Sequence, residues 1–443
     1  MVTHTCWKNP DLQHSASPCV VIQDAGECRR VKQGITKPLT PVSGLINISG
    51  LIKTSVMKKL YMQRSLVFLI GIAIGFGVAY AGSTLEEISE QLDVSSSNET
   101  ETVIIGDDQS FVTLIEDLSH RRVVYIGETH DRYDHHLNQL AVIKALHENG
   151  MDLAIGLEFF QRPYQRHLDD YVAGTIDEKP LLKRSAYYTN WGYDFRLYRP
   201  VLEYARENGI ALVALNAPKE LVSQVSEKGF DGLSAAGKSQ LPEVQIPADS
   251  SYKGQLEKIF NAHRVPGKNL DRFVQVQLLW DEYMAESAAD YLQANPEKRM
   301  VVLAGSGHVA VDSGIPQRVH QRVPEAYSVL INTGPVSRGP GSAEYAMLAR
   351  GEELPKAGKL GLLIRESGRG VTVKRRSGSR VEGAGVVVPG DMITSIAGEP
   401  VRSLEDVHLA MLDRLPGEEV WIELKRTWNG GKSEKVTAII ELI

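Results

Sequence analysis

The residues of this 443-residue chain that are best suited to chemistry are two histidines, His130 and His308. Each lies three positions beyond a glycine that ends a β-branched apolar run, residues 123–127 and 301–305. Such a run predicts a strand, and we expect its glycine to let the backbone turn sharply, so that the imidazole points back over the strand end. Because ligands of α/β sheets lie beyond the carboxyl ends of strands, we expect both imidazoles at one site.

Two glutamates and an amide are predicted to reach the same edge. Glu128 precedes the first histidine by two residues, Glu158 follows the strand-like run 153–157, and Asn216 ends another such run. Imidazole and carboxylate are good ligands for a divalent metal, and the same groups can act as general acids and bases. The pattern therefore indicates a metal site with an open position or an acid–base cluster, with Asn216 as an orienting amide or oxyanion donor.

The remaining patterns narrow the possible chemistry. His135 and His136 are consecutive on a predicted helix, so their side chains should point to different sides, and we interpret them as solvated. The sequence contains no His-Glu-x-x-His, no Gly-x-Ser-x-Gly and no cysteine after Cys28. These absences exclude the common metallo-, serine and cysteine hydrolases but not a Gly-x-x-His metal site.

Residues 187–198 are rich in aromatic side chains, although only 7% of the chain is aromatic. Flat rings with phenol oxygens can line a pocket for a large planar ligand, and a tyrosinate can bind ferric haem. A packed aromatic core is the simpler interpretation of the segment taken alone. No motif indicates which tyrosine would bind, and Tyr193 is chosen from local composition.

Composition is that of a soluble globular protein, with 42% hydrophobic and 23% charged residues. The formal charge of −6 and the lack of a basic stripe give no support to a nucleic-acid partner. All three cysteines lie within the first 28 residues. Structural disulfides and cysteine-ligated zinc are therefore excluded for the rest of the chain.

The segment 57–81 has the form of a secretory signal. A basic start at Lys58 and Lys59 precedes an apolar run, residues 65–78, and a small-x-small cleavage pattern ends at Ala81. We therefore predict an exported, periplasmic protein whose translation starts at Met57, with residues 1–56 as an unstructured upstream extension. An uncleaved membrane anchor is the alternative. Residues 82–110 are polar and acidic and are interpreted as a flexible lead-in.

Short apolar runs alternate with amphipathic runs between residues 111 and 335, which predicts an α/β domain with a mostly parallel sheet flanked by helices. Its predicted strands are 122–127, 153–158, 210–216, 300–305 and 328–332, and its predicted helices are 134–149, 164–173, 197–208, 219–228 and 270–295. Residues 229–268, rich in Gly and Pro, are interpreted as an irregular insertion or lid. Residues 336–355 are interpreted as a linker. A small β-rich domain follows, with predicted strands at 360–364, 371–374, 392–396, 420–424 and 436–442 and a helix at 404–413.

Four motifs of the first domain, in this order and spacing, resemble a known family. Gly127-Glu128-Thr129-His130, Gly156-Leu157-Glu158, Ala214-Leu215-Asn216-Ala217-Pro218 and Gly305-Ser306-Gly307-His308 are similar to those of bacterial ChaN-type haem-binding proteins, within the Tiki/TraB/erythromycin-esterase-like group. The resemblance covers about residues 111–333. It implies an exported protein that binds haem in connection with iron acquisition, often as a homodimer, with haem held by a tyrosine, for which Tyr193 is the candidate, near His130 and His308. ChaN proteins are typically lipoproteins, and this chain lacks the lipobox cysteine.

Relatives in the wider group are metal-dependent peptidases, which supplies the alternative function. By this resemblance His130, His308 and Glu158 would hold a divalent metal, and Glu128 or Glu158 would activate its water. A scaffold with a vestigial site is a third possibility.

Residues 356–443 resemble a PDZ domain of the bacterial HtrA type. Leu360, Gly361, Leu362, Leu363 and Ile364 are similar to the carboxylate-binding loop and its strand, and Pro389-Gly390-Asp391-Met392-Ile393 matches the turn region. Arg380-Val381 replaces the usual Pro-Ala after Gly-Ser, away from the groove. The resemblance implies binding of C-terminal or extended peptides by strand addition. A PDZ fold used only for packing is the alternative.

Overall fold

The computed structural model of the chain describes residues 101–103, 109–243, 247–263, 269–309, 314–333, 343–377, 380–382, 387–428 and 431–443. The predicted upstream extension and signal segment, and most of the predicted lead-in, lie outside these residues. Among the helices that are described, none is both long and apolar enough to cross a membrane.

The first folded part is built on a seven-stranded sheet in the order β1-β7-β6-β2-β5-β3-β4, in which every neighbouring pair is parallel. This confirms the predicted fold class of an α/β core followed by a separate β-rich region. The strands are β1 (Glu101–Val103), β2 (Val123–Glu128), β3 (Leu153–Gln161), β4 (Ala211–Asn216), β5 (Arg299–Gly305), β6 (Tyr327–Thr333) and β7 (Tyr345–Leu348).

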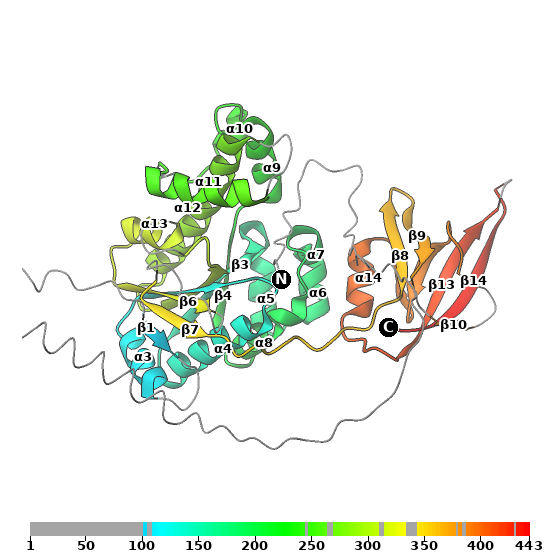
Figure 1. Cartoon of the computed structure of the whole chain (residues 1–443), viewed down its shortest axis with the longest axis horizontal. Helices are drawn as coiled ribbons and strands as arrows, with labels where there is room; N and C mark the ends of the chain where they lie inside the picture. Colours follow the sequence, from blue (N-terminus) through cyan, green and yellow to red (C-terminus); the bar gives the residue numbers. More distant parts are fainter. Residues whose placement is uncertain are drawn as a thin grey trace, which may run out of the picture. The chain divides into compact units, whose positions relative to one another are not determined.

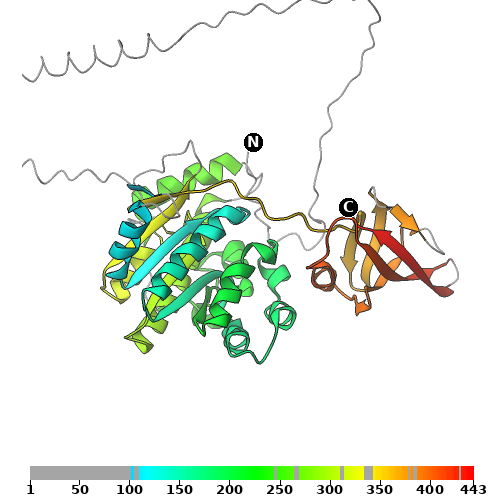
Figure 2. The same cartoon turned by 90° about the horizontal axis from the view of Figure 1, so that it is seen from below.

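Helices cover both faces of this sheet (Figures 1 and 2). One face packs on α3 (Gln109–Ser119), α4 (Tyr133–Glu148), α5 (Gln165–Val172), α6 (Glu178–Arg184), α7 (Tyr187–Asn190) and α8 (Arg199–Glu207). The other packs on α12 (Leu270–Ala294) and α13 (Ile315–Arg322). The remaining elements are η2 (Arg162–Tyr164), η3 (Phe195–Leu197), α9 (Lys219–Lys228), α10 (Ala235–Lys238) and α11 (Ser250–His263).

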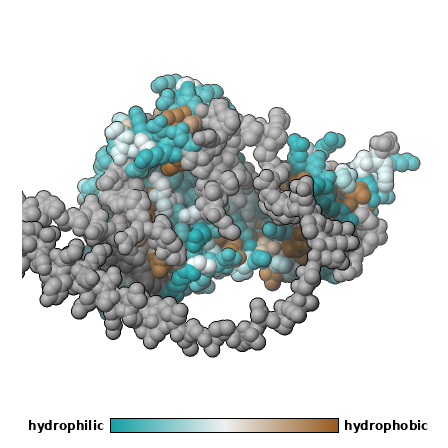
Figure 3. All heavy atoms as spheres, viewed as in Figure 1, coloured by the Kyte–Doolittle hydropathy of each residue, from teal (hydrophilic) through white to brown (hydrophobic). Residues whose placement is uncertain are grey.

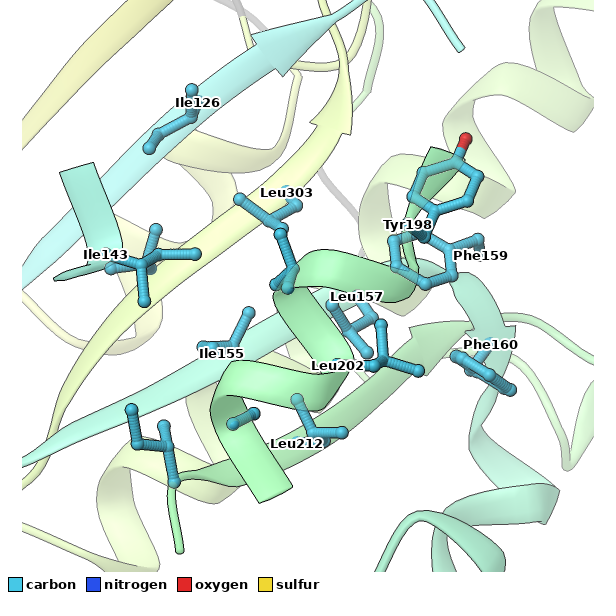
Figure 4. Close-up of a cluster of buried hydrophobic side chains, with 14 of the residues drawn as sticks. Ile126, Ile143, Ile155, Leu157, Phe159, Phe160, Tyr198, Leu202, Leu212 and Leu303 are labelled. Carbon is cyan, nitrogen blue, oxygen red and sulfur yellow. The ribbon is translucent and has the colours of Figure 1, made fainter. Parts of the chain in front are cut away.

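Alternate residues of each central strand enter different cores, as the period of two of a strand requires. In β2, Ile126 packs in the core on the α4 and α8 side, whereas Tyr125 packs on the α12 side. The first of these cores is drawn in Figure 4, where Ile126 of β2, Leu303 of β5 and Ile155 of β3 contribute to it from three consecutive strands. Burial on both faces explains why the central strands are continuous apolar runs in the sequence.

The helices α3, α6, α7 and α13 were not predicted, and three further segments differ from their sequence-based interpretation. The predicted linker contains β7, and the predicted lead-in contains β1, which pairs with it. The insertion that was expected to be irregular contains the helices α10 and α11. In each case the element is short or flanked by Gly, Pro and charged residues, which hide its pattern.

The C-terminal residues form an antiparallel sheet in the order β10-β14-β13-β11-β9-β8, with β12 paired to β11. Its strands are β8 (Leu362–Ser367), β9 (Gly370–Arg376), β10 (Arg380–Glu382), β11 (Met392–Ile396), β12 (Glu399–Pro400), β13 (Glu419–Thr427) and β14 (Ser433–Glu441). The helix α14 (Leu404–Met411) begins with a capping box at Ser403 and Asp406. The C-terminal sheet has its own core, which includes Val371, Ile393, Ile422 and Ile440.

Candidate functional site

Three adjacent strands bring the predicted site residues to one edge of the parallel sheet. The strands β2, β5 and β3 are consecutive in the sheet. Glu128 pairs with Gly305 across β2 and β5, and Leu157 pairs with Leu303 across β3 and β5. β2 ends at Glu128 and β5 ends at Gly305, whereas β3 continues to Gln161 but pairs with β5 only as far as Leu157. Glu128, Glu158 and the loops that carry the two histidines therefore lie together at this edge.

The first histidine is held by the glutamate that precedes it. Nδ1 of His130 lies 2.9 Å from Oε1 of Glu128. A carboxylate can only accept, so Nδ1 carries the proton and Nε2 is left for another partner. The His130 side chain is 17% exposed, whereas that of Glu128 is 1% exposed.

Glu128 is the centre of a buried network. Its Oε1 also accepts from the Tyr198 hydroxyl at 3.1 Å, and its Oε2 accepts from Nε2 of Gln139 at 2.8 Å and lies 3.2 Å from Nδ1 of His136. Burial alone would raise the pKa of Glu128, but the positive charge of His136 and hydrogen bonds from both histidines hold it well below its ordinary value. Glu128 is therefore an ionised group whose oxygens are already engaged.

The second histidine is held by a carboxylate from a distant helix. Nδ1 of His308 lies 2.6 Å from Oδ1 of Asp281 on α12, and Oδ2 of the same carboxylate accepts from the Tyr252 hydroxyl of α11 at 2.6 Å. Asp281 is fully buried. Burial by itself would lower the pKa of His308, but the charges of Asp281 and Glu158 outweigh it and raise the pKa to about 9.

Glu158 lies between the two histidines. Its Oε2 accepts from the backbone N–H of Gly305 at 2.6 Å, and its Oε1 lies 3.7 Å from Nε2 of His308. Burial alone would lower the pKa of His130, but its hydrogen bond to Glu128 and the charge of Glu158 raise it. The edge of the sheet thus holds two histidine–carboxylate pairs with a third carboxylate between them.

The two glycines of the Gly-x-x-His motifs allow neighbouring groups to approach the backbone closely. The expectation that each glycine permits a sharp turn was wrong. Neither has the left-handed φ of a sharp turn. A Cβ on Gly127 would lie 2.9 Å from the Ser306 hydroxyl, and a Cβ on Gly305 would lie 2.9 Å from Cε1 of His130. The bare backbone of each strand end therefore leaves room for the loop or ring of its neighbour.

Aromatic rings flank the first histidine. The ring of His130 lies 4.8 Å from that of Trp191 and 5.2 Å from that of Tyr193, between centroids. The Trp191 indole donates to the Tyr198 hydroxyl at 3.1 Å. Tyr193 and Trp191 are half-buried, whereas Tyr198 is buried. The aromatic segment is thus part core and part wall of the site, and Tyr193 belongs to the wall.

Asn216 lies at this edge, but its amide is engaged by the backbone. Its Nδ2 donates to the carbonyl oxygen of Glu158 at 2.8 Å, and its Oδ1 accepts from the N–H of Ala217 at 2.8 Å. The side chain ties the end of β4 to that of β3 and so supports Glu158.

The interpretation of His135 and His136 as solvated was wrong. Both are buried, because the first turn of α4 packs beneath the strand ends. His136 contacts Glu128, and Nδ1 of His135 accepts from the N–H of Thr129 at 3.0 Å. His135 has its pKa lowered to about 4, chiefly by burial.

Within the residues that the structure describes, no group of three or more His, Cys, Asp or Glu side chains is arranged to hold a metal ion. The carboxylate partners on Nδ1 of His130 and His308 are nevertheless of the kind that orients histidines in metal and acid–base sites alike.

Sequence reasoning missed Asp281, Tyr252 and the role of Tyr198. A signal for Asp281 exists, because Asp281-Glu282 interrupts the apolar middle of the predicted helix 270–295. A carboxylate in such a position is buried and requires a partner. The sequence holds no comparable signal for Tyr252, which lies in the insertion.

Comparison with known proteins supports the resemblance of the first domain. Residues 114–319 match the family model described as haem-binding uptake, Tiki superfamily, ChaN. A curated relative, the protein RETICULATA-RELATED 5, chloroplastic, of Arabidopsis thaliana, is 24% identical over 256 residues, which is 53% of this chain and 34% of the relative. The chain thus spans about a third of the length of this relative.

Solved structures with a similar fold are more distant. One is described as cofacial haem binding to ChaN of Campylobacter jejuni (19% identity, 54% of this chain and 91% of that chain, TM-score 0.44). Another is the erythromycin esterase EreC in its open conformation (16% identity, 53% and 78%, TM-score 0.35). A third is the type III effector HopBA1 (15% identity, 54% and 93%, TM-score 0.34). None is similar enough to carry an inference about activity.

Proposed function

We propose that the α/β domain binds haem at the carboxyl edge of its sheet and that the protein is exported and serves iron acquisition. The observation that carries the proposal is the match of residues 114–319 to a family whose description is haem-binding uptake. The matched residues include every strand-end group of the site, from Glu128 to His308.

The side chains of this edge fit a flat, iron-containing ligand. Trp191 and Tyr193 supply flat apolar faces beside His130. The half-buried Lys219 donates from Nζ to the carbonyl oxygen of Thr189, next to the aromatic segment, and is a cation suited to a haem carboxylate. When bound, haem would supply a ferric iron to which a phenolate or imidazole can coordinate. We assign the phenolate to Tyr193 and the imidazole to His130, with Lys219 on a carboxylate.

Titration of the purified full chain with haemin tests the proposal by absorption spectroscopy. We expect a shift of the Soret band on binding that Tyr193→Phe changes and His130→Ala weakens. Tyr204→Phe is the matched control, because Tyr204 lies near the C-terminal ends of α4 and α8, where it contacts His147, away from the strand-end site. Equal spectra for all four proteins would remove both residues from the haem site. The absence of any shift would overturn haem binding. We also propose the homodimer that the family resemblance implies, which sedimentation with and without haemin tests.

Export rests on the signal-like segment 57–81 and is tested by the N-terminus of the mature protein. We expect a chain produced in a bacterium to be recovered from the periplasm starting at Gly82. The name of the chloroplastic relative supports an organelle address as the alternative. Import into isolated chloroplasts, with cleavage elsewhere, would contradict export.

We further propose that the C-terminal sheet binds the carboxyl end of an extended peptide along β8. Among the residues that the structure describes, this strand ends the sheet and pairs on one side only, with β9. The start of α14 lies beside it, because the N–H of Leu404 donates to Glu366. Leu362, Leu363 and Ile364 are half-buried, and Gly361 before them has a φ of +60°. An open edge with apolar side chains and a glycine turn at its start suits strand addition.

A matched pair of glycine variants tests this proposal. Gly361→Asp adds a negative charge to the proposed carboxylate-binding loop, whereas Gly368→Asp adds the same charge at an open turn beyond β8. We expect only the first variant to lose binding of free-carboxylate peptides in a fluorescence anisotropy screen. The screen also includes the same peptides with an amidated C-terminus. If the unchanged protein bound them as tightly as the free-carboxylate peptides, recognition of the carboxyl end would be contradicted.

The arrangement of the two histidine pairs favours a second candidate function, hydrolysis. His308, protonated at neutral pH because its pKa is about 9, could donate its Nε2 proton to a leaving group. The Glu158 carboxylate, with Oε1 facing His308, could take a proton from the attacking water. The water oxygen would bond to the acyl carbon, and the bond between that carbon and the leaving nitrogen or oxygen would then break as the leaving group takes the proton of His308. We assign the base to Glu158, because both oxygens of Glu128 are engaged.

Hydrolysis of peptide and ester panels, with and without a chelator and added divalent metals, tests this candidate. We expect turnover that His308→Ala removes and His147→Ala, at the end of α4 away from the site, leaves unchanged. Turnover that survives chelation supports acid–base chemistry, and turnover that requires added metal supports the metal-dependent alternative. Turnover that survives His308→Ala would exclude both.

A further inference from the structure

Like charges lie opposite one another at one end of the C-terminal sheet. Lys425 of β13 and Lys435 of β14 occupy directly opposite positions of the ladder, and both are exposed. Like charges in such positions destabilise a strand pair. Glu423 contacts Lys435 at 2.7 Å. In the described part of the chain, Lys425 forms no ion pair, so the stability of the sheet does not account for it.

Two further lysines lie at the same end. Thr372 of β9 pairs with Met392 of β11, and Met392 pairs with Lys425. Lys374, two residues beyond Thr372, therefore lies on the same face and nearer the end of the sheet. Lys432 lies in the turn between β13 and β14 and is exposed. We call Lys374, Lys425, Lys432 and Lys435 the basic end. Its nearby carboxylates are Glu423, Glu434 and the buried Asp391.

The turn at the basic end presents a tryptophan. The Trp428 side chain is 54% exposed. The backbone N–H of Trp428 donates to the carbonyl oxygen of Lys432 at 2.9 Å, and the carbonyl oxygen of Trp428 accepts from the backbone N–H of Gly431 at 3.1 Å. The Arg426 guanidinium lies 5.9 Å from the indole centroid and is bound by Asp391 through two hydrogen bonds of 2.8 Å.

The hairpin also extends past its neighbours. The β13–β14 ladder continues to Thr427, whereas β11 pairs with β13 only as far as Lys425. Figure 3 shows mainly hydrophilic side chains around this end of the hairpin. The tip therefore places an indole and several ammonium groups where a flat surface could meet them together.

We infer that the basic end docks the C-terminal domain on an anionic phospholipid surface. Lysines on long stems with an exposed indole among them match the interface of a bilayer, where tryptophan lies at headgroup level and lysine pairs with lipid phosphate or carboxylate. The lysines are spread over a strand face and a turn. Of the arginines at this end, Arg426 is bound by Asp391, and the exposed Arg375 and Arg376 follow Lys374 on β9 and add to the positive charge. The attraction is local, because the whole chain carries a formal charge of −6.

Co-sedimentation of the full chain with vesicles tests the inference. The probes are phosphatidylcholine vesicles and vesicles containing about one third phosphatidylserine, the lipid that makes cytoplasmic leaflets anionic. The N-terminal segment, which carries Lys58 and Lys59, is the same in every variant, so the readout is the change in the ratio of the two affinities from one variant to another. We expect Lys425→Gln with Lys432→Gln to lower this ratio about 25-fold, roughly fivefold for each lysine near the surface. Salt should lower it further.

Matched controls separate the basic end from charge in general. Arg369→Gln with Arg402→Gln removes the same charge from exposed positions near the other end of the sheet and should leave the ratio unchanged. Quenching of tryptophan fluorescence by brominated phosphatidylserine should fall in Trp428→Phe and persist in Trp421→Phe. A ratio of one for the unchanged protein, or equal effects of the two double variants, would overturn the inference. The inference would also be overturned if the lysines were needed to bind a nucleic acid and the protein did not bind vesicles.

Discussion

The two histidines of the site are held in the same way by carboxylates of different origin. Glu128 lies two residues before His130 on the same strand end, whereas Asp281 reaches His308 from the middle of a long helix. The first pair is therefore fixed by local backbone geometry. The second exists only when α12 has packed on the sheet, and through Tyr252 it also depends on α11.

The two pairs also differ in what surrounds the carboxylate. Glu128 is engaged by two histidines, a glutamine and a tyrosine within the core, so its charge supports the fold as well as the site. Asp281 has two partners. The Glu128 pair is therefore a structural centre, whereas the Asp281 pair links the site to the insertion that contains α11.

The largest effect is expected from breaking the first pair. Glu128→Gln keeps the shape of the side chain but leaves buried histidines without their counter-charge, which should lower the free energy of unfolding by about 3–5 kcal/mol. Urea unfolding at neutral pH measures it. Glu116→Gln, at an exposed position of α3, is the control and should change little. A loss below about 1 kcal/mol would mean that Glu128 is not the centre described above.

The second pair should be visible as a dependence of stability on pH. Because the pKa of His308 is raised to about 9 in the folded protein, its contribution is complete below the ordinary value near 6.5 and is lost as pH rises through about 9. The loss should be about 3 kcal/mol at most. Asp281→Asn should lower stability at pH 6 and flatten the slope between pH 6.5 and 9. If Asp281→Asn left this slope unchanged, the pH dependence of stability would have to come from groups other than His308.

Sequence reasoning placed both members of the first pair at the sheet edge but missed Asp281 of the second, for a physical reason. The strands β2, β3 and β5 are buried on both faces, so their apolar runs end visibly at Glu128, Glu158 and Gly305. Asp281 approaches from a helix more than a hundred residues away from the first pair, and only packing brings it to His308. A sequence pattern indicates that such a carboxylate is buried but not what it contacts.

The boundaries of the fold show the same limit. The helix predicted at 219–228 and the strand predicted at 392–396 agree with α9 and β11, because their apolar patterns are long relative to their flanks. β7 is a four-residue strand that lies between a Gly- and Pro-rich segment and a charged segment. Its few apolar residues form a strand because they pair with β6 and β1. Local pattern gave no register for such a short segment, one strand in from the edge of the sheet.

A smaller effect is expected where the first pair meets β5. Gly305→Ala would place a methyl group 2.9 Å from Cε1 of His130, whose ring is fixed by Glu128, and should cost about 1–3 kcal/mol and displace the imidazole. Gly307→Ala is the matched control, since a Cβ there meets nothing within 4 Å. Unfolding and a histidine NMR spectrum measure both effects. Equal spectra for the two variants would show that the ring is not confined by Gly305.

The smallest effect should come from Tyr252, and it tests whether the insertion is linked to the site. Tyr252→Phe removes one hydrogen bond to Asp281 and leaves the bond to His308, so a loss of roughly 1 kcal/mol is expected. Tyr204→Phe, at a half-buried tyrosine away from the site, is the control. Combined with Asp281→Asn, the Tyr252 change should cost almost nothing more, because the acceptor's charge is already gone. If the two losses simply add, α11 and His308 are independent. The second histidine pair would then not be coupled to the insertion, just as the first pair is not.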